Sequence, residues 1–177
     1  MVQQGENTIN SSCFKLEFEE QENSNITILE GYPISDEDGK KLVPYTFSIK
    51  NGCGVKARYV IRLELDNSTT MSEQYIKSQL NTGSIKKISE LKPTNTTLAN
   101  AKSSYILEEM TINGNETKSF ELRLWIDGSV SYDNKEVMDK IFQGKVTIEG
   151  NYDGTYTESI LNGTDPVLKE NLIPVTI

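Results

Sequence analysis

Two cysteines, Cys13 and Cys53, are the residues of this chain whose type and spacing most directly suggest chemistry. Cys13 begins one stretch of alternating apolar residues, and Cys53 lies in the turn that ends another. If the two stretches are antiparallel neighbours, the thiols meet and can form a disulfide. Such a bond would close a loop of about 40 residues, stabilise the fold by roughly 4 kcal/mol and indicate an oxidising, extracellular compartment. The alternative is two free buried thiols.

The chain has no histidine. This excludes Ser-His-Asp catalysis, Cys-His catalysis and histidine-ligated zinc, and it leaves neither cysteine with a base that would activate it as a nucleophile. The sequence also lacks a glycine-rich phosphate loop and a Cys-X-X-Cys motif. Paired carboxylates of the glycosidase type are positioned by the fold, so the sequence alone does not test for them. We therefore expect a protein that is not an enzyme and has no catalytic residues, cofactor or metal.

An acidic run and the tryptophan can each be interpreted as a functional or as a structural feature. Asp36, Glu37 and Asp38 precede Gly39 and offer the oxygen ligands that Ca²⁺ prefers. The run lacks the spacing of an EF-hand loop and its distal glutamate, which favours solvated loop charges over a calcium site. Trp125, the only tryptophan, falls on the polar face of a predicted strand. We expect it to pack under a helix predicted at residues 134–142, with an exposed contact surface as the alternative.

The composition suits one soluble domain with a sizeable core, since the 177 residues are 36% hydrophobic and 25% charged. A net charge of -8 argues against a nucleic-acid surface and against docking on an anionic membrane. No apolar run approaches the roughly 18 residues of a transmembrane helix, so we expect no membrane span. Glycosylation stays open, because a chain rich in Asn, Ser and Thr forms sequons by chance. The sequons lie at Asn10, Asn25, Asn67, Asn95, Asn115 and Asn162.

The stretch from residue 44 to residue 65 predicts the elements that would position these residues. Tyr45, Phe47 and Ile49 alternate with polar side chains, and residues 55–65 alternate in the same way, which is the period of half-buried strands. Asn51-Gly52 tolerates the positive φ of a tight turn, so the pattern predicts a β-hairpin. Further strands are predicted at residues 13–19, 26–29, 75–80, 105–112, 118–126, 144–152 and 156–161.

Two short helices are predicted as well. In one, at residues 134–142, an apolar stripe follows the capping residue Asn134; the other is a helical turn at residues 84–91. Short strands separated by Asn-Gly, Asp-Gly and Pro turns are typical of an all-β fold. We predict a jelly-roll-like antiparallel β-sandwich with one or two short helices.

The chain divides into three predicted parts. Residues 1–10 are a polar N-terminal extension, and residues 11–162 form the β-sandwich domain. Residues 163–177 are an apolar C-terminal strand or a linker to further domains.

The order of short motifs along the chain carries a family resemblance. A small-residue turn enters an alternating strand at residues 10–16, and a polar strand at residues 25–28 leads to a Pro-containing turn. An aromatic-X-aromatic-X-Ile strand with an Asn-Gly turn follows at residues 45–52, and a long alternating strand at residues 55–65. Near the end, a Gln-Gly step leads into a strand within residues 139–148. In this order of motifs the chain resembles the TasA/camelysin-like family of secreted Gram-positive (Firmicutes) surface and matrix fibre proteins.

Three shorter motifs are similar to those of N-terminal domains in surface proteins of low-GC Firmicutes. They are a Tyr-Pro-Ile-Ser-Asp-Glu loop at residues 32–37, a Pro-Tyr-Thr-Phe strand at residues 44–47 and a Leu-Arg-Leu-Trp strand at residues 122–125. The likeness spans residues 7–150, and its motifs are structural. The cysteine pair and the apolar stretch at residues 167–177 depart from the TasA pattern. Some camelysin-like proteins are labelled metalloproteases, but this chain lacks the His-Glu-X-X-His motif of that activity.

The resemblance implies a jelly roll that is exported to the cell surface or the biofilm matrix. It also implies that copies of the chain join head to tail in a fibre, because each subunit donates an N-terminal strand to the next. On this hypothesis residues 1–10 are the donor strand, and Val2 and Ile9 are its polymer contacts. The alternative is a non-catalytic domain of a cell-surface adhesin. The apolar C-terminal stretch supports this alternative, since it suggests that more chain follows.

Overall fold

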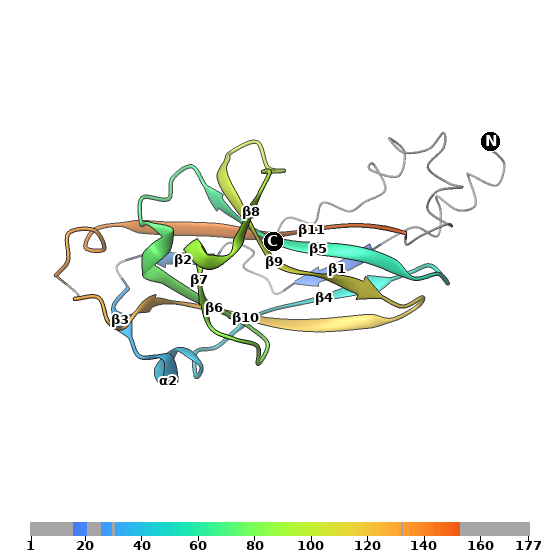
Figure 1. Cartoon of the computed structure of the whole chain (residues 1–177), viewed down its shortest axis with the longest axis horizontal. Coiled ribbons are helices and arrows are strands. Elements are labelled where there is room, and N and C mark those ends of the chain that lie inside the picture. Colours follow the sequence, from blue (N-terminus) through green and yellow to red (C-terminus); the bar gives the residue numbers. More distant parts are fainter. Residues whose placement is uncertain (1–15, 21–25, 30, 132, 153–177) are drawn as a thin grey trace.

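The computed structural model describes residues 16–20, 26–29, 31–131 and 133–152, with the backbone alone for residues 16–20, 26–29 and 151–152. Its strands form two sheets that pack face to face, seen as the two layers of Figure 1. The fold is an all-β, jelly-roll-like sandwich, as predicted. No helix in the described part of the chain is long and apolar enough to cross a membrane.

The first sheet has the order β1–β4–β10–β6–β7, with β3 beside β10. Its strands are β1 (Leu16–Glu20), β3 (Pro33–Ile34), β4 (Tyr45–Asn51), β6 (Ile76–Leu80), β7 (Lys86–Lys87) and β10 (Thr117–Asp127). The second sheet has the order β2–β11–β5–β9–β8. Its strands are β2 (Ile26–Leu29), β5 (Ala57–Asp66), β8 (Lys92–Thr94), β9 (Ala101–Ile112) and β11 (Ile141–Tyr152). The β3–β10 pair is parallel, and the other pairs that link these strands are antiparallel.

Side chains that alternate along the long strands fill the space between the layers. The inner face of β4 is buried, and so are the odd-numbered residues of β5 from Ala57 to Leu65. Phe120 of β10 stacks on Phe47, with ring centroids 5.1 Å apart, and it meets Tyr59 edge-on at 6.3 Å. These offset and edge-on arrangements are the favourable ones for aromatic pairs. The inward faces are those that the period-two pattern predicted.

The predicted hairpin of residues 44–65 is wrong in its pairing, although both strands exist. β4 pairs with β1 and β10, whereas β5 pairs with β9 and β11 in the other sheet. Residues 52–56 therefore carry the chain across the core. Because the two strands lie in different layers, their apolar faces meet and bury each other, which a hairpin within one sheet would not allow.

The helix predicted at residues 134–142 is also wrong. Residues 135–139 make a turn, and β11 begins at Ile141. Asp139 has a φ of 61°, in the left-handed region, which a right-handed helix cannot contain. Asn134 does accept a hydrogen bond from the Glu136 N–H at 2.8 Å, so its capping chemistry serves one turn only.

The observed helical segments are short. At residues 84–91 a single 3₁₀ turn forms, η2 (Ile88–Glu90), and another, η1 (Glu73–Tyr75), leads into β6. The one α-helix among the described residues is α2 (Asp36–Gly39), which lies beneath the first sheet in Figure 1. It occupies the stretch that the sequence predicted as an acidic loop.

Candidate functional site

The corner around Cys53 contains the one predicted site residue that lies within the described structure. β1 is an edge strand of the first sheet and runs antiparallel to β4, with Leu16 opposite Asn51. This confirms the strand pairing on which the disulfide prediction depends. Cys53 is buried, with 3% of its surface exposed. Cys13 lies outside the described residues, so the bond itself stays a prediction.

Asn51, at the end of β4, organises this corner through its side-chain amide. Its Nδ2 donates to the carbonyl oxygen of Val55 at 2.7 Å and to that of Asn113 at 3.1 Å. Its Oδ1 accepts from the Cys53 N–H at 3.0 Å. Because Asn51 is 1% exposed, each of these bonds satisfies a polar atom that water does not reach. One side chain thus ties the 52–56 connection to the turn between β9 and β10.

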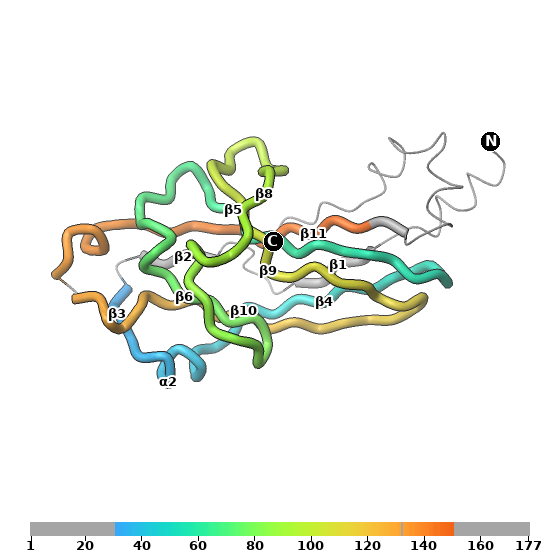
Figure 2. The backbone as a smooth tube through the Cα atoms, in the orientation of Figure 1, coloured from blue at the N-terminus to red at the C-terminus, as the bar shows by residue number. Residues whose placement is uncertain are grey.

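The two connections at this corner are packed backbone against backbone. Figure 2 shows residues 52–56 and residues 113–116 as neighbouring bends at the right-hand end of the molecule. The Asn115 N–H donates to the Cys53 carbonyl at 2.9 Å. A Cβ on Gly114 would lie 2.4 Å from the Gly54 backbone, which only glycine avoids. The connection after β4 and the turn between β9 and β10 are therefore closely packed against each other.

The sequence predictions missed the role of Asn51. They treated it as a turn residue, because Asn-Gly is the commonest signal for a tight turn. Its partners, Val55, Ile112 and Asn113, include residues that are far away in the sequence. The available signal was a polar residue that continues the buried face of β4, which reads Tyr45, Phe47, Ile49, Asn51.

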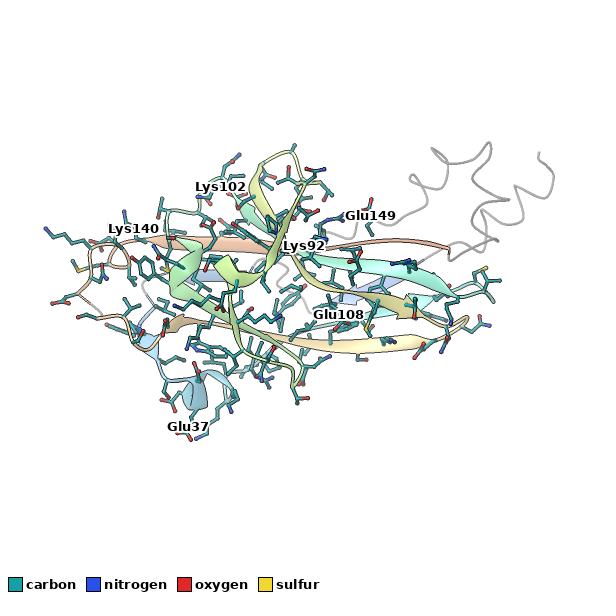
Figure 3. All side chains as sticks on the ribbon, viewed as in Figure 1. Glu37, Lys92, Lys102, Glu108, Lys140 and Glu149 are labelled. Atoms are coloured by element: carbon teal, nitrogen blue, oxygen red, sulfur yellow. The ribbon has the colours of Figure 1, made fainter. Side chains whose placement is uncertain are left out.

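The three acidic residues that the sequence analysis weighed as calcium ligands have structural roles or face solvent. Asp36 accepts from Lys77 Nζ at 3.0 Å and from Trp125 Nε1 at 3.3 Å. Glu37 and Asp38 are exposed, and Figure 3 shows Glu37 pointing away from the sandwich. In the part of the chain that the structure describes, no group of three or more His, Cys, Asp or Glu side chains is arranged to hold a metal ion.

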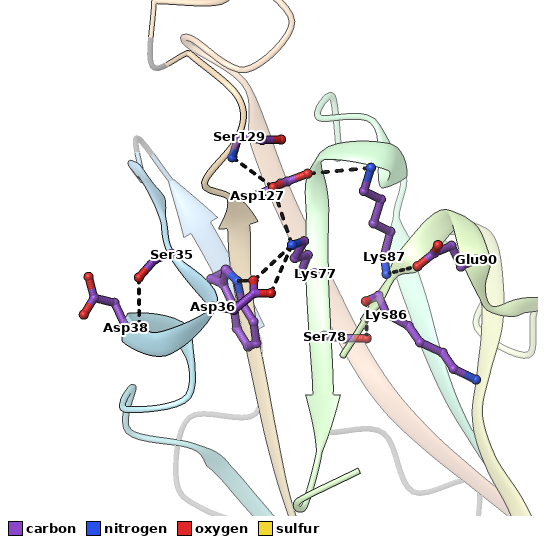
Figure 4. A network of polar contacts seen from close by, with 11 residues as sticks. Ser35, Asp36, Asp38, Lys77, Ser78, Lys86, Lys87, Glu90, Asp127 and Ser129 are labelled. Atoms are coloured by element: carbon purple, nitrogen blue, oxygen red, sulfur yellow. Dashed lines mark hydrogen bonds and ion pairs between the residues drawn. The ribbon is translucent and has the colours of Figure 1, made fainter. Parts of the chain in front are cut away.

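Asp36 belongs to a network of acidic and basic side chains on the outer face of the first sheet. Figure 4 shows Lys77 between Asp36 and Asp127, with Lys87 on the other side of Asp127. Each lysine nitrogen lies 3.6 Å from a carboxylate oxygen of Asp127. The hydrogen bond to Asp36 raises the pKa of Lys77 although burial opposes this. The charges balance, so the network fastens α2 to the sheet.

Asp127 is the most buried member of this network, with 7% of its side chain exposed. Burial raises its pKa, but the N–H of Ser129, 3.0 Å from Oδ1, and the two lysines outweigh burial. The pKa of Asp127 is therefore lowered overall. The side chain is held as a carboxylate at neutral pH, which suits a structural anchor and not a proton donor.

Glu64 is a second buried carboxylate that the sequence predictions missed. It is 1% exposed on the outward side of β5 and carries no ion pair in the described residues. Its Oε1 accepts from the N–H groups of Thr97 at 2.7 Å and Leu98 at 3.1 Å, and its Oε2 accepts from the Thr147 hydroxyl at 2.6 Å and from the Thr97 hydroxyl. These donors fasten the 95–100 loop over the second sheet.

Trp125 is buried, with 2% of its surface exposed, and its indole is covered by α2. A Cβ placed on Gly39 would lie 2.3 Å from Trp125 Cδ2. The prediction of a covered tryptophan is confirmed, but the covering element is α2 and not a helix at residues 134–142. The two donor-strand residues, Val2 and Ile9, lie outside the described residues.

Comparison with known proteins does not place this chain in a family. No family model matches the sequence, and no curated protein matches it. A solved structure of AvmM, which catalyses macrocyclization in alchivemycin A biosynthesis, aligns over 77% of this chain and 84% of that chain. The TM-score is 0.35 and the sequence identity 6%, a likeness too low to bear on function. The site has to be interpreted from its own geometry.

Proposed function

We propose that this chain is an extracellular structural subunit of a bacterial matrix fibre or pilus-like filament, assembled by donor-strand exchange. The observation that supports this is the position of β1. Among the described residues β1 is an edge strand, and its first residue, Leu16, lies opposite Asn51 at one end of the long strands. A segment that starts there is well placed to join a neighbouring subunit.

The donor in this proposal is residues 1–10. An added strand is held by main-chain hydrogen bonds along a sheet edge and by alternate side chains in pockets of the acceptor. Val2 and Ile9 are an odd number of residues apart, so a regular strand places them on opposite faces. One then enters the acceptor, and the other covers its surface. The contact is head to tail, and such contacts build open filaments.

A disulfide between Cys13 and Cys53 belongs to the same proposal, because it would anchor the donor segment and indicate export. Cys13 precedes Leu16 by three positions, and Leu16 lies opposite Asn51, which precedes Cys53 by two. The chain from Leu16 to Cys13 spans at most about 10 Å. This spacing across the β1–β4 pair supports the proposed bond between Cys13 and Cys53.

The bond is tested by mass spectrometry of the secreted protein without reductant. We expect a mass about 2 Da below that of the reduced chain and a Cys13–Cys53 peptide after digestion, from the loss of two hydrogens. Two free thiols in freshly secreted protein would contradict the disulfide while leaving the filament proposal open.

Support for a non-catalytic role comes from the carboxylates of the described residues. Asp36, Glu64 and Asp127 all make hydrogen bonds or ion pairs that fasten one element to another. Their partners are lysines, hydroxyls and backbone N–H groups within the fold. This is how side chains that stabilise a rigid subunit are arranged.

Negative-stain electron microscopy tests the filament. We expect filaments from the full chain and none after removal of residues 1–10. The double variant Val2→Ser/Ile9→Ser should lose filaments, whereas the matched control Gln3→Ser/Gln4→Ser should keep them. Monomers from every version would refute strand donation and favour the alternative, a non-catalytic domain of a cell-surface adhesin.

A further inference from the structure

The sandwich has a groove between β6 of the first sheet and β9 of the second, with polar as well as apolar side chains in its lining. Its volume is about 410 Å³. Leu80, Leu91 and Leu107 line it, and all three are half-buried and pack against the core. Lys92 and Glu108, both labelled in Figure 3, add charged groups to its lining. The groove is therefore an incompletely covered part of the core.

One wall of the groove is a sheet edge without a partner in the described residues. β8 pairs with β9 only as far as Ile106. Residues 108–112 of β9 then pair with β5 on one side, and no described strand pairs with them on the other. Unpaired N–H and C=O groups in a row are a template for another strand.

The inner face of this part of β9 shows the same lack of cover. Met110 lies opposite Tyr59 and so belongs to the face of β9 that points to the core. It is nevertheless 44% exposed. The neighbouring inward residue, Glu108, accepts a hydrogen bond from the Tyr59 hydroxyl at 3.1 Å, which satisfies a carboxylate at this edge. An apolar strand on the free side of β9 would bury Met110.

We propose that residues 172–177 of the same chain add to this edge as a further strand. The segment reads Leu-Ile-Pro-Val-Thr-Ile, with Ile173, Val175 and Ile177 at period two. In an extended strand these three side chains share one face. Residues 108–112 and residues 173–177 are equal in length. An antiparallel strand there continues the line of β8, which pairs with the preceding part of β9.

The register follows from burial of the apolar face. Pairing Ile173 with Ile112, Val175 with Met110 and Ile177 with Glu108 places the three apolar side chains on the face of β9 that points to the core, since directly opposed residues share a face. A shift by one residue would direct them to solvent.

Pro174 fits this register. It falls opposite Thr111, and proline has no N–H to donate. The carbonyl oxygen of Thr111 already accepts from Lys118 Nζ at 3.0 Å. The Thr111 carbonyl oxygen therefore keeps a donor even when a proline lies opposite it. Elsewhere, proline inside a fully paired strand is unfavourable.

The course of the chain favours docking within one molecule. β11 ends at Tyr152, opposite Ala57, and Ala57 lies opposite Ile112. The chain thus leaves β11 at the end of the sandwich where the added strand must begin. From β11 to the free side of β9 there are about three strand spacings, roughly 14 Å. Residues 153–171 bridge that distance easily, and the tether gives an effective concentration of roughly millimolar order.

Residues 1–10 fit the edge less well. Their large apolar side chains are Val2 and Ile9, which a regular strand places on opposite faces. The C-terminal segment supplies three on one face. The inference is thus independent of the filament proposal, in which residues 1–10 act on another subunit.

Amide hydrogen exchange of the full chain tests the inference against a version that lacks residues 172–177. We expect those amides of residues 108–112 that point away from β5 to exchange at least ten-fold more slowly in the full chain. The variant Ile173→Ser/Val175→Ser/Ile177→Ser should lose this protection, and the matched control Val167→Ser/Leu168→Ser should keep it. The amides of β4 and β11 should be unchanged in all versions, which shows that the sandwich remains folded.

Two results would overturn the inference. Equal exchange of these outward-pointing amides of residues 108–112 in the full chain and the triple serine variant would show that the segment does not cover β9. Protection that grows with protein concentration would show that the covering strand comes from a second copy and not from the same chain.

Discussion

At the scale of single residues, buried polar side chains connect separate elements of the described structure. Asn51 links two connections at the Cys53 corner, Asp127 joins β10 to lysines of β6 and β7, and Glu64 holds the 95–100 loop on the second sheet. Each is nearly inaccessible to solvent. A buried polar group that loses its partners costs about 1–3 kcal/mol, so these residues are sensitive positions.

Asp127→Asn should destabilise the protein at neutral pH by about 1–3 kcal/mol, because the amide cannot pair with Lys77 and Lys87. The pKa of Asp127 is lowered below its ordinary value of 3.8 by its hydrogen bonds and lysine neighbours. Its charge therefore stabilises the fold above the ordinary pKa, and this contribution fades as the pH falls through the lowered value. Urea unfolding of both proteins from pH 7 down to pH 2 measures the difference.

Asp38→Asn is the matched control for this experiment. Asp38 is an exposed residue of α2, and its carboxylate makes no hydrogen bond or ion pair among the described residues. We expect its unfolding free energy to match that of the wild type within about 0.5 kcal/mol at every pH. A gap between wild type and Asp127→Asn that persists unchanged to pH 2 would contradict the electrostatic account.

The roles of these residues were beyond prediction from the sequence for a physical reason. Asp127 follows a strand that was predicted almost to the residue, yet Lys77 and Lys87 reach it from β6 and β7. Side-chain periodicity reports which face a residue occupies, not which element covers it. The cysteine prediction named a contact between distant residues because it assumed that β1 pairs with β4. The observed register confirms that pairing.

At the scale of elements, local sequence patterns predicted where the strands lie but did not predict which strands pair with each other. Residues 26–29 and 118–126 were predicted within a residue of β2 and β10. The β4–β5 connection has a turn signal at Asn51-Gly52, but whether a turn joins neighbours in a sheet or crosses the core depends on the other strands. The helix at residues 134–142 failed because apolar residues at helical spacing also arise where a turn meets a strand.

α2 covers Trp125, and this contact predicts the effect of a single methyl group. Gly39→Ala would place a Cβ 2.3 Å from the indole ring, so the helix must shift outward. We expect a loss of about 1–3 kcal/mol in unfolding free energy, as for other overpacked sites. Because Trp125 is the only tryptophan, its emission should also shift to longer wavelength as water reaches the ring.

Gly54→Ala is the matched control, because a Cβ on Gly54 meets no atom within 4 Å. We expect its stability to equal or slightly exceed that of the wild type, since alanine restricts the unfolded chain. Unchanged stability and fluorescence in Gly39→Ala would mean that α2 does not pack on the tryptophan.

At the scale of the whole molecule, one continuous core joins the two sheets. It includes Phe47 and Phe120 from the first sheet and Tyr59, Ile61 and Val146 from the second. The outer face of the first sheet carries α2 and the Asp127 network, and the outer face of the second carries the Glu64 anchor. Composition and strand periodicity predicted two layers, whereas the order of strands within each layer depends on contacts between distant residues.

Because the two sheets share one core, a destabilising substitution on one outer face should lower the unfolding midpoint of both sheets. Glu64→Gln replaces one acceptor oxygen with an NH₂ group that faces N–H and O–H donors, so it should cost about 2–4 kcal/mol. If the sandwich unfolds as one unit, Trp125 fluorescence on the opposite sheet must report the same lowered urea midpoint as circular dichroism of the strands. Glu109→Gln, at an exposed position of β9, should leave both midpoints unchanged. A tryptophan midpoint that stays at the wild-type value while the circular dichroism midpoint falls would show instead that the two sheets unfold separately.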